Sequence, residues 1–213
     1  VAEILGEIKE QRITYGHNES GKKQKTMIEY TNVNTHKEYH VGHLRNLCFG
    51  DSVHKTMLAN GYLSIPVSYI NDFGIHVAKT LWAYLEYYKD QKLPKNKEQF
   101  LGEVYVRSNQ ESKDKPHIKE LINFMMKKIE SREGEEYKLW QKTREWSIEQ
   151  FDSIYEDLDV KLEKVYYESE FIDEGRALVD ELLEKKILKH SQVAVIADLE
   201  EQNLGVLVFL RSY

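Results

Sequence analysis

The alternation of strand and helix patterns in the first half of the chain constrains the fold most. A β-prone run at residues 26–31 is followed by a loop, and an apolar pattern of helical period then covers residues 42–61. Apolar and polar residues alternate at residues 63–69, which indicates a second strand although Pro66 removes one backbone donor. A second helical pattern occupies residues 78–88. Strand, helix, strand, helix predicts an α/β fold built on a parallel sheet.

The remainder of the chain has a different, mostly helical pattern. Amphipathic stripes at residues 118–129 and 137–158 predict two helices, and Val104-Tyr105-Val106 resembles a lone strand. Apolar residues at 178–183 mark a further helix. Short strands are predicted at residues 160–167, 193–197 and 205–210. Residues 92–200 are therefore predicted to form a mostly helical insertion into the sheet domain.

Composition and charge exclude several classes of protein. Of 213 residues, 41% are hydrophobic, so the chain can bury a core and global disorder is excluded. The formal net charge of −6 argues against a generic basic coat for nucleic acid. The single cysteine, Cys48, excludes a disulfide framework and fits a reducing compartment. Without a membrane-length apolar run or a signal-peptide layout, we expect a soluble, cytoplasmic protein with no membrane partner.

The two ends of the sequence suggest a piece of a longer protein. The chain starts at Val1 and stops at Tyr213, directly after an apolar run. An apolar strand at a chain end usually pairs with a later segment. We therefore expect that more of the protein follows.

The segment His40-Val41-Gly42-His43 stands where the first loop gives way to the first helix. The free N–H groups and the positive end of a helix favour an anion such as phosphate. Gly42 lets a ring or a phosphate approach the backbone, and both imidazoles can donate hydrogen bonds to phosphate oxygens. HxGH alone also fits ordinary helix-start histidines, or a metal site with His36 nearby, although no third ligand is evident.

The context of this segment resembles the arginyl-tRNA synthetases. Residues 28–34 precede the HxGH segment at the spacing found in that family, where the segment is a HIGH-type signature. The resemblance extends over nearly the whole chain and is strongest from residue 26 to residue 86. Two positions depart from the family, because most members carry proline where Val33 and Glu38 stand here, which predicts a softer loop. Further similar segments are Tyr15-Gly16, Gly50-Asp51, residues 59–62, residues 68–74, residues 102–106 and residues 199–212.

The resemblance implies a Rossmann-like class I synthetase fold, HIGH-type, with a mostly helical connective-peptide insertion. Residues 1–25 would form an N-terminal helical lead-in, and residues 26–91 the first half of the catalytic domain. Residues 92–200 would be the connective-peptide insertion, and residues 201–213 the start of the return to the catalytic sheet. The family's lysine-rich signature loop and anticodon-binding helices would lie beyond Tyr213.

Site residues are carried over to the positions that match the family's motifs. His40 and His43 would be catalytic and would bind ATP, with Gly42 at the adenine or ribose. Glu29 would pair with the guanidinium of arginine, since a planar cation prefers a carboxylate. Asn34 would hold the polar end of the amino acid. Asn32 and Asp72 are further candidates for arginine binding, although an Asn-Asp-x-Gly turn explains Asp72 equally well.

The implied function is ligation of arginine to tRNA(Arg), through ATP-dependent formation of arginyl-adenylate. ATP is a substrate, Mg²⁺ is expected to accompany it, and no protein-bound metal is expected. The partners would be ATP, L-arginine and tRNA(Arg), and we expect a monomer. The chain alone is predicted to be an incomplete, inactive fragment. Two alternatives stay open: a nucleotidylyltransferase that shares the HxGH signature, and a synthetase-like binding module without turnover.

Overall fold

A computed structural model describes residues 1–191 and 194–211, with the side chains of residues 210 and 211 excluded. The chain divides into two compact units, Val1–Tyr167 and Glu168–Tyr213, which are described separately. Among the described residues, no helix is both long enough and apolar enough to cross a membrane.

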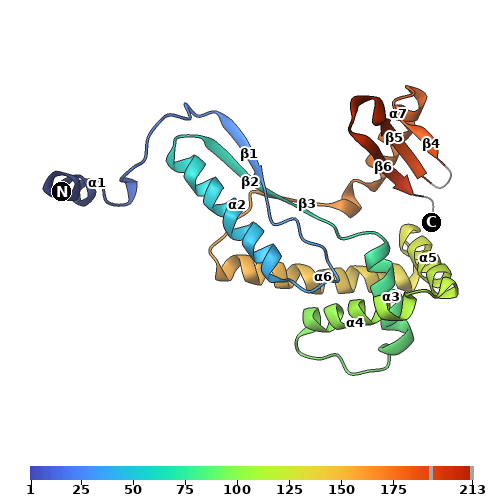
Figure 1. Ribbon diagram of the computed structural model, residues 1–213. Coiled ribbons are helices and arrows are strands. Elements are labelled where there is room, and N and C mark those ends of the chain that lie inside the picture. Colours follow the sequence, from blue (N-terminus) through green and yellow to red (C-terminus); the bar gives the residue numbers. More distant parts are fainter. Residues whose placement is uncertain (192–193, 212–213) are drawn as a thin grey trace. The chain divides into compact units, whose positions relative to one another are not determined.

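The first unit contains a three-stranded parallel sheet. Strands β1 (Lys25–Glu29), β2 (Leu63–Ile70) and β3 (Lys164–Tyr167) lie in that order, with Met27 opposite Ile65 and Ser68 opposite Val165. Helix α2 (Val41–Ala59) connects β1 to β2, as Figure 1 shows. This βαβ unit confirms the predicted α/β fold with a parallel sheet.

Pro66 lies within the central strand, where a missing N–H should break the ladder. Its carbonyl oxygen accepts the N–H of Glu163 at 2.8 Å, so this residue faces the β3 side of the sheet. Strand β3 begins only at Lys164. The absent donor of Pro66 therefore falls just before the third strand starts, where no ladder bond is interrupted.

Four helices lie between β2 and β3 in the chain. They are α3 (Ile75–Tyr87), α4 (Lys97–Ser112), α5 (Pro116–Glu130) and α6 (Gly134–Asp157). The predicted lone strand at Val104-Tyr105-Val106 is wrong, because these residues lie inside α4. Asn96 caps that helix by accepting the N–H of Gln99 at 3.0 Å, and Val104 is completely buried on its inner face.

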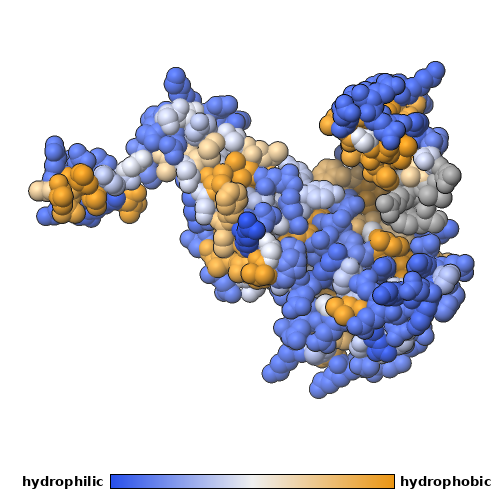
Figure 2. Space-filling view, in the orientation of Figure 1, coloured by the Kyte–Doolittle hydropathy of each residue, from blue (hydrophilic) through white to orange (hydrophobic). Residues whose placement is uncertain are grey.

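A hydrophobic core joins the sheet to α2 and α6. Leu47 of α2 and Phe151 and Tyr155 of α6 pack with buried residues of the sheet and its loops, namely Tyr30, Val33, Ile70 and Val160. Val33, which stands where the family usually has proline, is 1% exposed in this core. Helix α2 is apolar on its other side too, since Val41, Leu44, Phe49 and Leu58 are exposed, and Figure 2 shows apolar side chains along it.

The chain enters the first unit through α1 (Ala2–Gln11) and a 3-10 turn, η1 (Arg12–Thr14), neither of which contains a buried residue. Gly21 is buried against Tyr62, and an added Cβ would lie 2.4 Å from the Tyr62 ring. This close approach joins the segment before β1 to the start of β2.

The second unit is a small antiparallel sheet with one helix. It contains η2 (Glu168–Glu170), α7 (Ile172–Glu184), β4 (Lys189–Ser191), β5 (Ala194–Leu199), η3 (Glu200–Gln202) and β6 (Gly205–Arg211). Its core consists of Val179, Leu188, Val195 and Ala197. Part of the strand predicted at residues 193–197, namely Val193, lies outside the described residues.

The pairing of two strands, β3 and β6, bears on the predicted segment boundaries. Strand β3 falls within residues 92–200, the predicted insertion, yet it pairs in parallel with β2. Strand β6 pairs with β5 in the antiparallel sheet, whereas residues 201–213 were predicted to begin the return to the catalytic sheet. The assignment of these segments to family domains stays a prediction.

Candidate functional site

The loops after β1 and β2 lie side by side at the carboxyl edge of the parallel sheet. Asn34 forms an isolated parallel bridge with Asn71. The N–H of Thr35 donates to the carbonyl of Asn71, and the N–H of Asn71 donates to the carbonyl of Val33, both at 3.1 Å. In open α/β sheets, ligands bind at this edge. The bridge therefore brings two candidate loops to the place where a ligand is expected.

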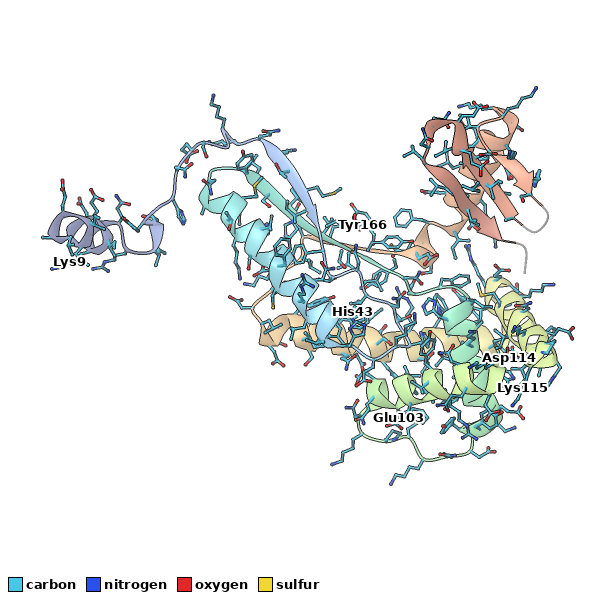
Figure 3. All side chains as sticks on the ribbon, in the orientation of Figure 1. Lys9, His43, Glu103, Asp114, Lys115 and Tyr166 are labelled. Atoms are coloured by element: carbon cyan, nitrogen blue, oxygen red, sulfur yellow. The ribbon has the colours of Figure 1, made fainter. Side chains whose placement is uncertain are left out.

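His40 and His43 meet at the first turn of α2. Their ring centroids are 3.8 Å apart and their planes differ by 19°, so the imidazoles are stacked. His40 is the N-cap residue, and its Nδ1 accepts the N–H of Gly42 at 3.1 Å. The Nδ1 of His43 accepts the N–H of His40 at 3.3 Å, which completes a reciprocal capping box. Figure 3 labels His43 at this end of α2.

This capping arrangement fixes which ring nitrogen carries the proton. A nitrogen that accepts a backbone N–H cannot itself be protonated. In the neutral form, both His40 and His43 must therefore carry their proton on Nε2, the nitrogen that no cap uses. Two Nε2–H donors at the positive end of the α2 dipole make this end of the helix suited to an anion.

The surroundings of His43 favour its neutral form. Burial lowers the pKa of His43, and the positive charges of His40 and Lys37 lower it further. Gly42 provides the space that the arrangement needs, since an added Cβ would lie 2.9 Å from Cε1 of His40. Tyr39 packs on the other side of His43, with ring centroids 5.2 Å apart.

Glu29 is the last residue of β1 and its side chain is exposed. Its Oε1 accepts the Nδ2–H of Asn32 at 2.8 Å, and Oδ1 of Asn32 accepts the N–H of Tyr69 at 3.1 Å. Asn32 therefore links the carboxylate of Glu29 to the neighbouring strand. Asn34 is half-buried in the bridge to the second loop. Glu29 at the end of β1, with Asn32 and Asn34 in the loop that follows, thus lies at the carboxyl edge of the sheet.

Asp72 occupies a different environment from the other candidates. Its side chain is completely buried and forms an ion pair of 2.5 Å with Nε of Arg144 on α6. Trp140 of α6 donates from Nε1 to the backbone carbonyl of Asp72 at 2.8 Å. The contacts of Arg144 and Trp140 with Asp72 were not anticipated from the sequence, because both residues lie about seventy positions further along the chain.

The alternative of a metal site with His36 gains no support from the geometry. His36 is completely buried, and its two ring nitrogens contact the hydroxyls of Thr35 at 2.9 Å and Thr143 at 2.8 Å. Within residues 1–191 and 194–211, no group of three or more His, Cys, Asp or Glu is arranged to hold a metal ion.

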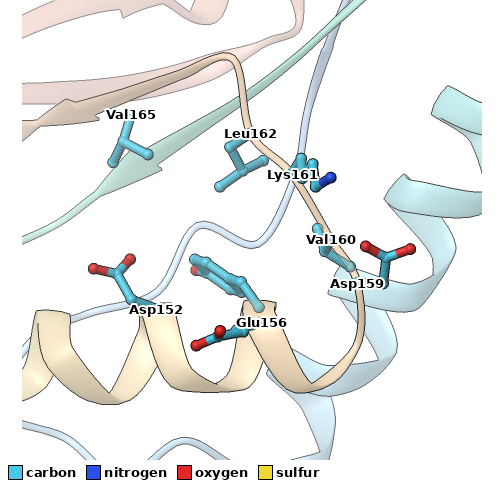
Figure 4. A pocket seen from close by; sticks show the side chains of 8 residues that line it. Asp152, Glu156, Asp159, Val160, Lys161, Leu162 and Val165 are labelled. Atoms are coloured by element: carbon cyan, nitrogen blue, oxygen red, sulfur yellow. The ribbon is translucent and has the colours of Figure 1, made fainter.

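A cavity of about 370 Å³ lies elsewhere, where α6 ends and the chain turns towards β3. Figure 4 shows Asp152, Glu156 and Asp159 at its wall, with Val165 of β3 opposite. The cavity is at the edge from which β3 begins, and three carboxylates would repel phosphate. It is therefore a poor candidate for the nucleotide.

Comparison with known protein families gives a match over almost the whole chain. The family described as "tRNA synthetases class I (R), catalytic domain" matches residues 5–212. The chain belongs to the class I arginyl-tRNA synthetase family. An arginine–tRNA ligase of Bdellovibrio bacteriovorus is 36% identical over 198 residues, which cover 90% of this chain and 34% of that protein. One of Pediococcus pentosaceus is 32% identical, over 96% of this chain and 36% of the relative.

Solved structures of the same family share the fold. The arginyl-tRNA synthetase of Plasmodium falciparum superposes with a TM-score of 0.66 at 24% identity, over 87% of this chain and 31% of the other. The Thermus thermophilus enzyme gives a TM-score of 0.62 at 23% identity, over 89% and 33%. The chain thus spans about a third of the length of the relatives it matches.

Proposed function

We propose that this chain provides the ATP and arginine sites of an arginine–tRNA ligase. The observation that carries the proposal is the pair of stacked imidazoles at the start of α2, whose Nδ1 atoms are both engaged in capping. Their Nε2–H groups are left to donate to a ligand, beside a helix start that favours phosphate.

In the proposed reaction, a carboxylate oxygen of arginine attacks the α-phosphorus of ATP. The bond from that phosphorus to the bridging oxygen of pyrophosphate breaks, which yields arginyl-adenylate. His40 and His43 donate to phosphate oxygens on which negative charge builds, and Gly42 lets the nucleotide approach the backbone. Mg²⁺ bound to ATP would offset part of the negative charge of its phosphates. The arginyl group then passes from the adenylate to a hydroxyl of tRNA(Arg), and AMP leaves.

Glu29 is proposed to bind the guanidinium of arginine. It is exposed at the carboxyl edge, and its bond to Asn32 orients the carboxylate without neutralising it. Asn34 is proposed to hold the ammonium and carboxylate of the substrate, because an amide both donates and accepts. Asn32 and Asp72 complete the proposed arginine set. Asp72 would act mainly by shaping its loop, since Arg144 already pairs with its buried carboxylate.

Calorimetric titration of ATP and of L-arginine into the chain tests the proposal. Glu29→Gln should weaken arginine binding by about tenfold or more while leaving ATP unaffected, since a charge-assisted bond contributes about 1.5–3 kcal/mol. His43→Ala should weaken ATP binding. Glu174→Gln and His190→Ala, at exposed positions in the second unit, are the matched controls.

Each outcome separates the proposed ligase from its alternatives. ATP binding with no response of arginine binding to Glu29→Gln would favour a nucleotidylyltransferase. Absence of binding of both ligands would contradict the proposal. Because the chain spans about a third of its relatives' length, we expect no arginine-dependent ATP–pyrophosphate exchange from it alone. Efficient exchange would refute the proposed incompleteness.

A further inference from the structure

One face of α6 follows both loops of the candidate site along almost the whole helix. Its contact residues recur every three or four positions, which places them on a single stripe. They are Trp140, Thr143, Arg144, Ser147, Phe151 and Tyr155, and all except Arg144 are buried. Figure 1 shows α6 running along the end of α2 and beside α3.

The first part of the stripe holds the loop after β2. Arg144 pairs with the buried carboxylate of Asp72, and Trp140 donates to the carbonyl of the same residue. The Arg144 guanidinium also stacks on Tyr167 of β3, 4.2 Å from the ring centroid. Side chain and backbone of Asp72 are thus both bound to α6, so this loop cannot move without the helix.

The middle of the stripe holds the loop between β1 and α2 through His36. Nε2 of His36 contacts Oγ1 of Thr143 at 2.8 Å, and its backbone N–H donates to Oγ of Ser147 at 3.0 Å. The hydroxyl of Thr143 donates its one proton to the carbonyl of Leu139 or Trp140, so it accepts from Nε2–H of His36. Nδ1 then accepts from the hydroxyl of Thr35.

The last part of the stripe reaches the signature histidines through a series of rings. Phe151 packs on Tyr39 with centroids 6.0 Å apart, and Tyr39 packs on His43 at 5.2 Å. Tyr155 donates to Oγ1 of Thr31 at 3.2 Å. Helix α6 therefore contacts the loop between β1 and α2 at three places, Thr31, His36 and Tyr39.

The loop needs such support because its backbone is unfavourable. Thr31, Asn32 and His36 have φ values of 73°, 45° and 60°, in the left-handed region. Asparagine and histidine are enriched there among non-glycine residues, but a β-branched threonine in this region is a genuine outlier. Residues in such conformations persist only where the surrounding structure holds them. For Thr31 and His36, partners on α6 supply those contacts.

We propose that α6 positions the two loops of the candidate site and that His36 is the positioning residue that fixes the β1–α2 loop. His36 touches no substrate in this assignment. It sets the path of the chain from Asn34 to His40, and therefore the distance between the proposed arginine and ATP sites. The inference rests on the proposed function only in naming what these loops bind.

The test compares single-atom changes on α6 in the absence of ligand. Thr143→Val and Ser147→Ala remove the two hydroxyls that contact His36, and Ser108→Ala is the matched control. Ser108 is equally buried on α4, but its hydroxyl bonds only within its own helix, to the carbonyl of Tyr105. Amide hydrogen exchange of residues 33–39 and the imidazole NMR signals of His40 and His43 are the measurements.

We expect Thr143→Val and Ser147→Ala to speed exchange in residues 33–39 about tenfold or more and to shift the His43 signals. Ser108→Ala should change neither. His36→Ala should act like the α6 variants, and His36→Gln, whose amide can still reach Thr143, should restore part of the protection. Wild-type exchange and imidazole signals in both α6 variants would overturn the inference. A wild-type chain that bound neither ATP nor arginine would instead refute the proposed function.

Discussion

Gly42 is the residue on which the geometry of the signature most depends. His40 uses its own ring to cap the helix, and that ring lies over the position that a side chain at residue 42 would occupy. Alanine at this position would place a Cβ 2.9 Å from Cε1 and 3.0 Å from Nδ1 of His40. The ring of His40 would have to move, and both the cap and the stack on His43 would be lost.

We predict that Gly42→Ala destabilises the first unit by about 1 kcal/mol, the usual effect of losing an N-cap. The His40 and His43 NMR signals should separate as the rings part. Gly175→Ala is the control, because an added Cβ on α7 meets no atom within 4 Å. Alanine there should be neutral or stabilising. Thermal unfolding and imidazole spectra measure both effects, and unchanged ring signals in Gly42→Ala would contradict the prediction.

His36 gives the stability of the protein a specific pH dependence. Burial, followed by the charges of His76 and Arg144, lowers the pKa of His36 to about 3. An unfolded histidine has a pKa of about 6.5, so between these values only the unfolded chain binds the proton. This contribution to stability is therefore complete above pH 6.5 and is lost as the pH falls towards 3.

The comparison of wild type with His36→Gln measures that contribution. Between pH 7.5 and pH 5, the wild type should lose about 2 kcal/mol more unfolding free energy than the variant. Burial also lowers the pKa of His76, to about 4, but His76 is present in both proteins and its effect cancels. Urea unfolding at three pH values provides the data. Parallel pH profiles for the two proteins would show that His36 is not the titrating group.

At the scale of residues, the sequence predicted local geometry and missed distant partners. The HxGH spacing correctly predicted two imidazoles at a helix start, because capping involves residues three positions apart. The sequence also suggested His36 as a metal ligand candidate, whereas its ring contacts Thr143, which is 107 residues away. The partner of Asp72 is 72 residues away. Contacts of this separation leave no periodic signal in a sequence.

Among the elements, α4 illustrates how packing overrides local preference. Val104-Tyr105-Val106 favours a strand by composition. Asn96 caps a helix before this run, and Phe100, Leu101 and Val104 fall on one buried helical face. A strand would have placed Tyr105 and Val104 on opposite sides and left half of this face exposed.

Helix α6 is the element whose loss should affect the parallel sheet most. Phe151 is 1% exposed in the core beneath the sheet, so Phe151→Ala should lower the unfolding free energy by about 3–5 kcal/mol. Phe124→Ala on α5 is the matched control, because that ring is 60% exposed and should contribute about 0.5 kcal/mol or less. Chemical denaturation of both variants provides the comparison. Equal losses of unfolding free energy in the two variants would mean that α6 does not stabilise this core.

The whole molecule consists of two units with separate hydrophobic cores. Val195 is 8% exposed in the core of the second unit, and a carboxylate there would be buried without a partner. Val195→Asp should therefore unfold the antiparallel sheet while the parallel sheet of the first unit stays folded. Val206→Asp, at a position 46% exposed on β6, should leave both sheets folded. Loss of dispersion across the whole spectrum of Val195→Asp would contradict independent cores.

At this scale the sequence predicted the parallel sheet, but it does not specify how strands that are distant in the chain pair. The βαβ pattern is continuous in sequence, whereas β3 has four residues and returns to β2 after four helices. The last strands were predicted individually, yet their pairing with each other depends on contacts that period-two alternation does not specify.

Pro66 limits how far the pairing between β2 and β3 extends towards the start of β2. Ring closure onto nitrogen leaves the middle of β2 without a hydrogen to offer at that point, so the Pro66 carbonyl accepts the N–H of Glu163 but Pro66 returns no bond to the segment before Lys164. The hollow bordered by Asp152 and Val165 lies where the chain passes from the end of α6 to this start of β3. The proline in the central strand thus sets the point at which the regular pairing of β3 begins.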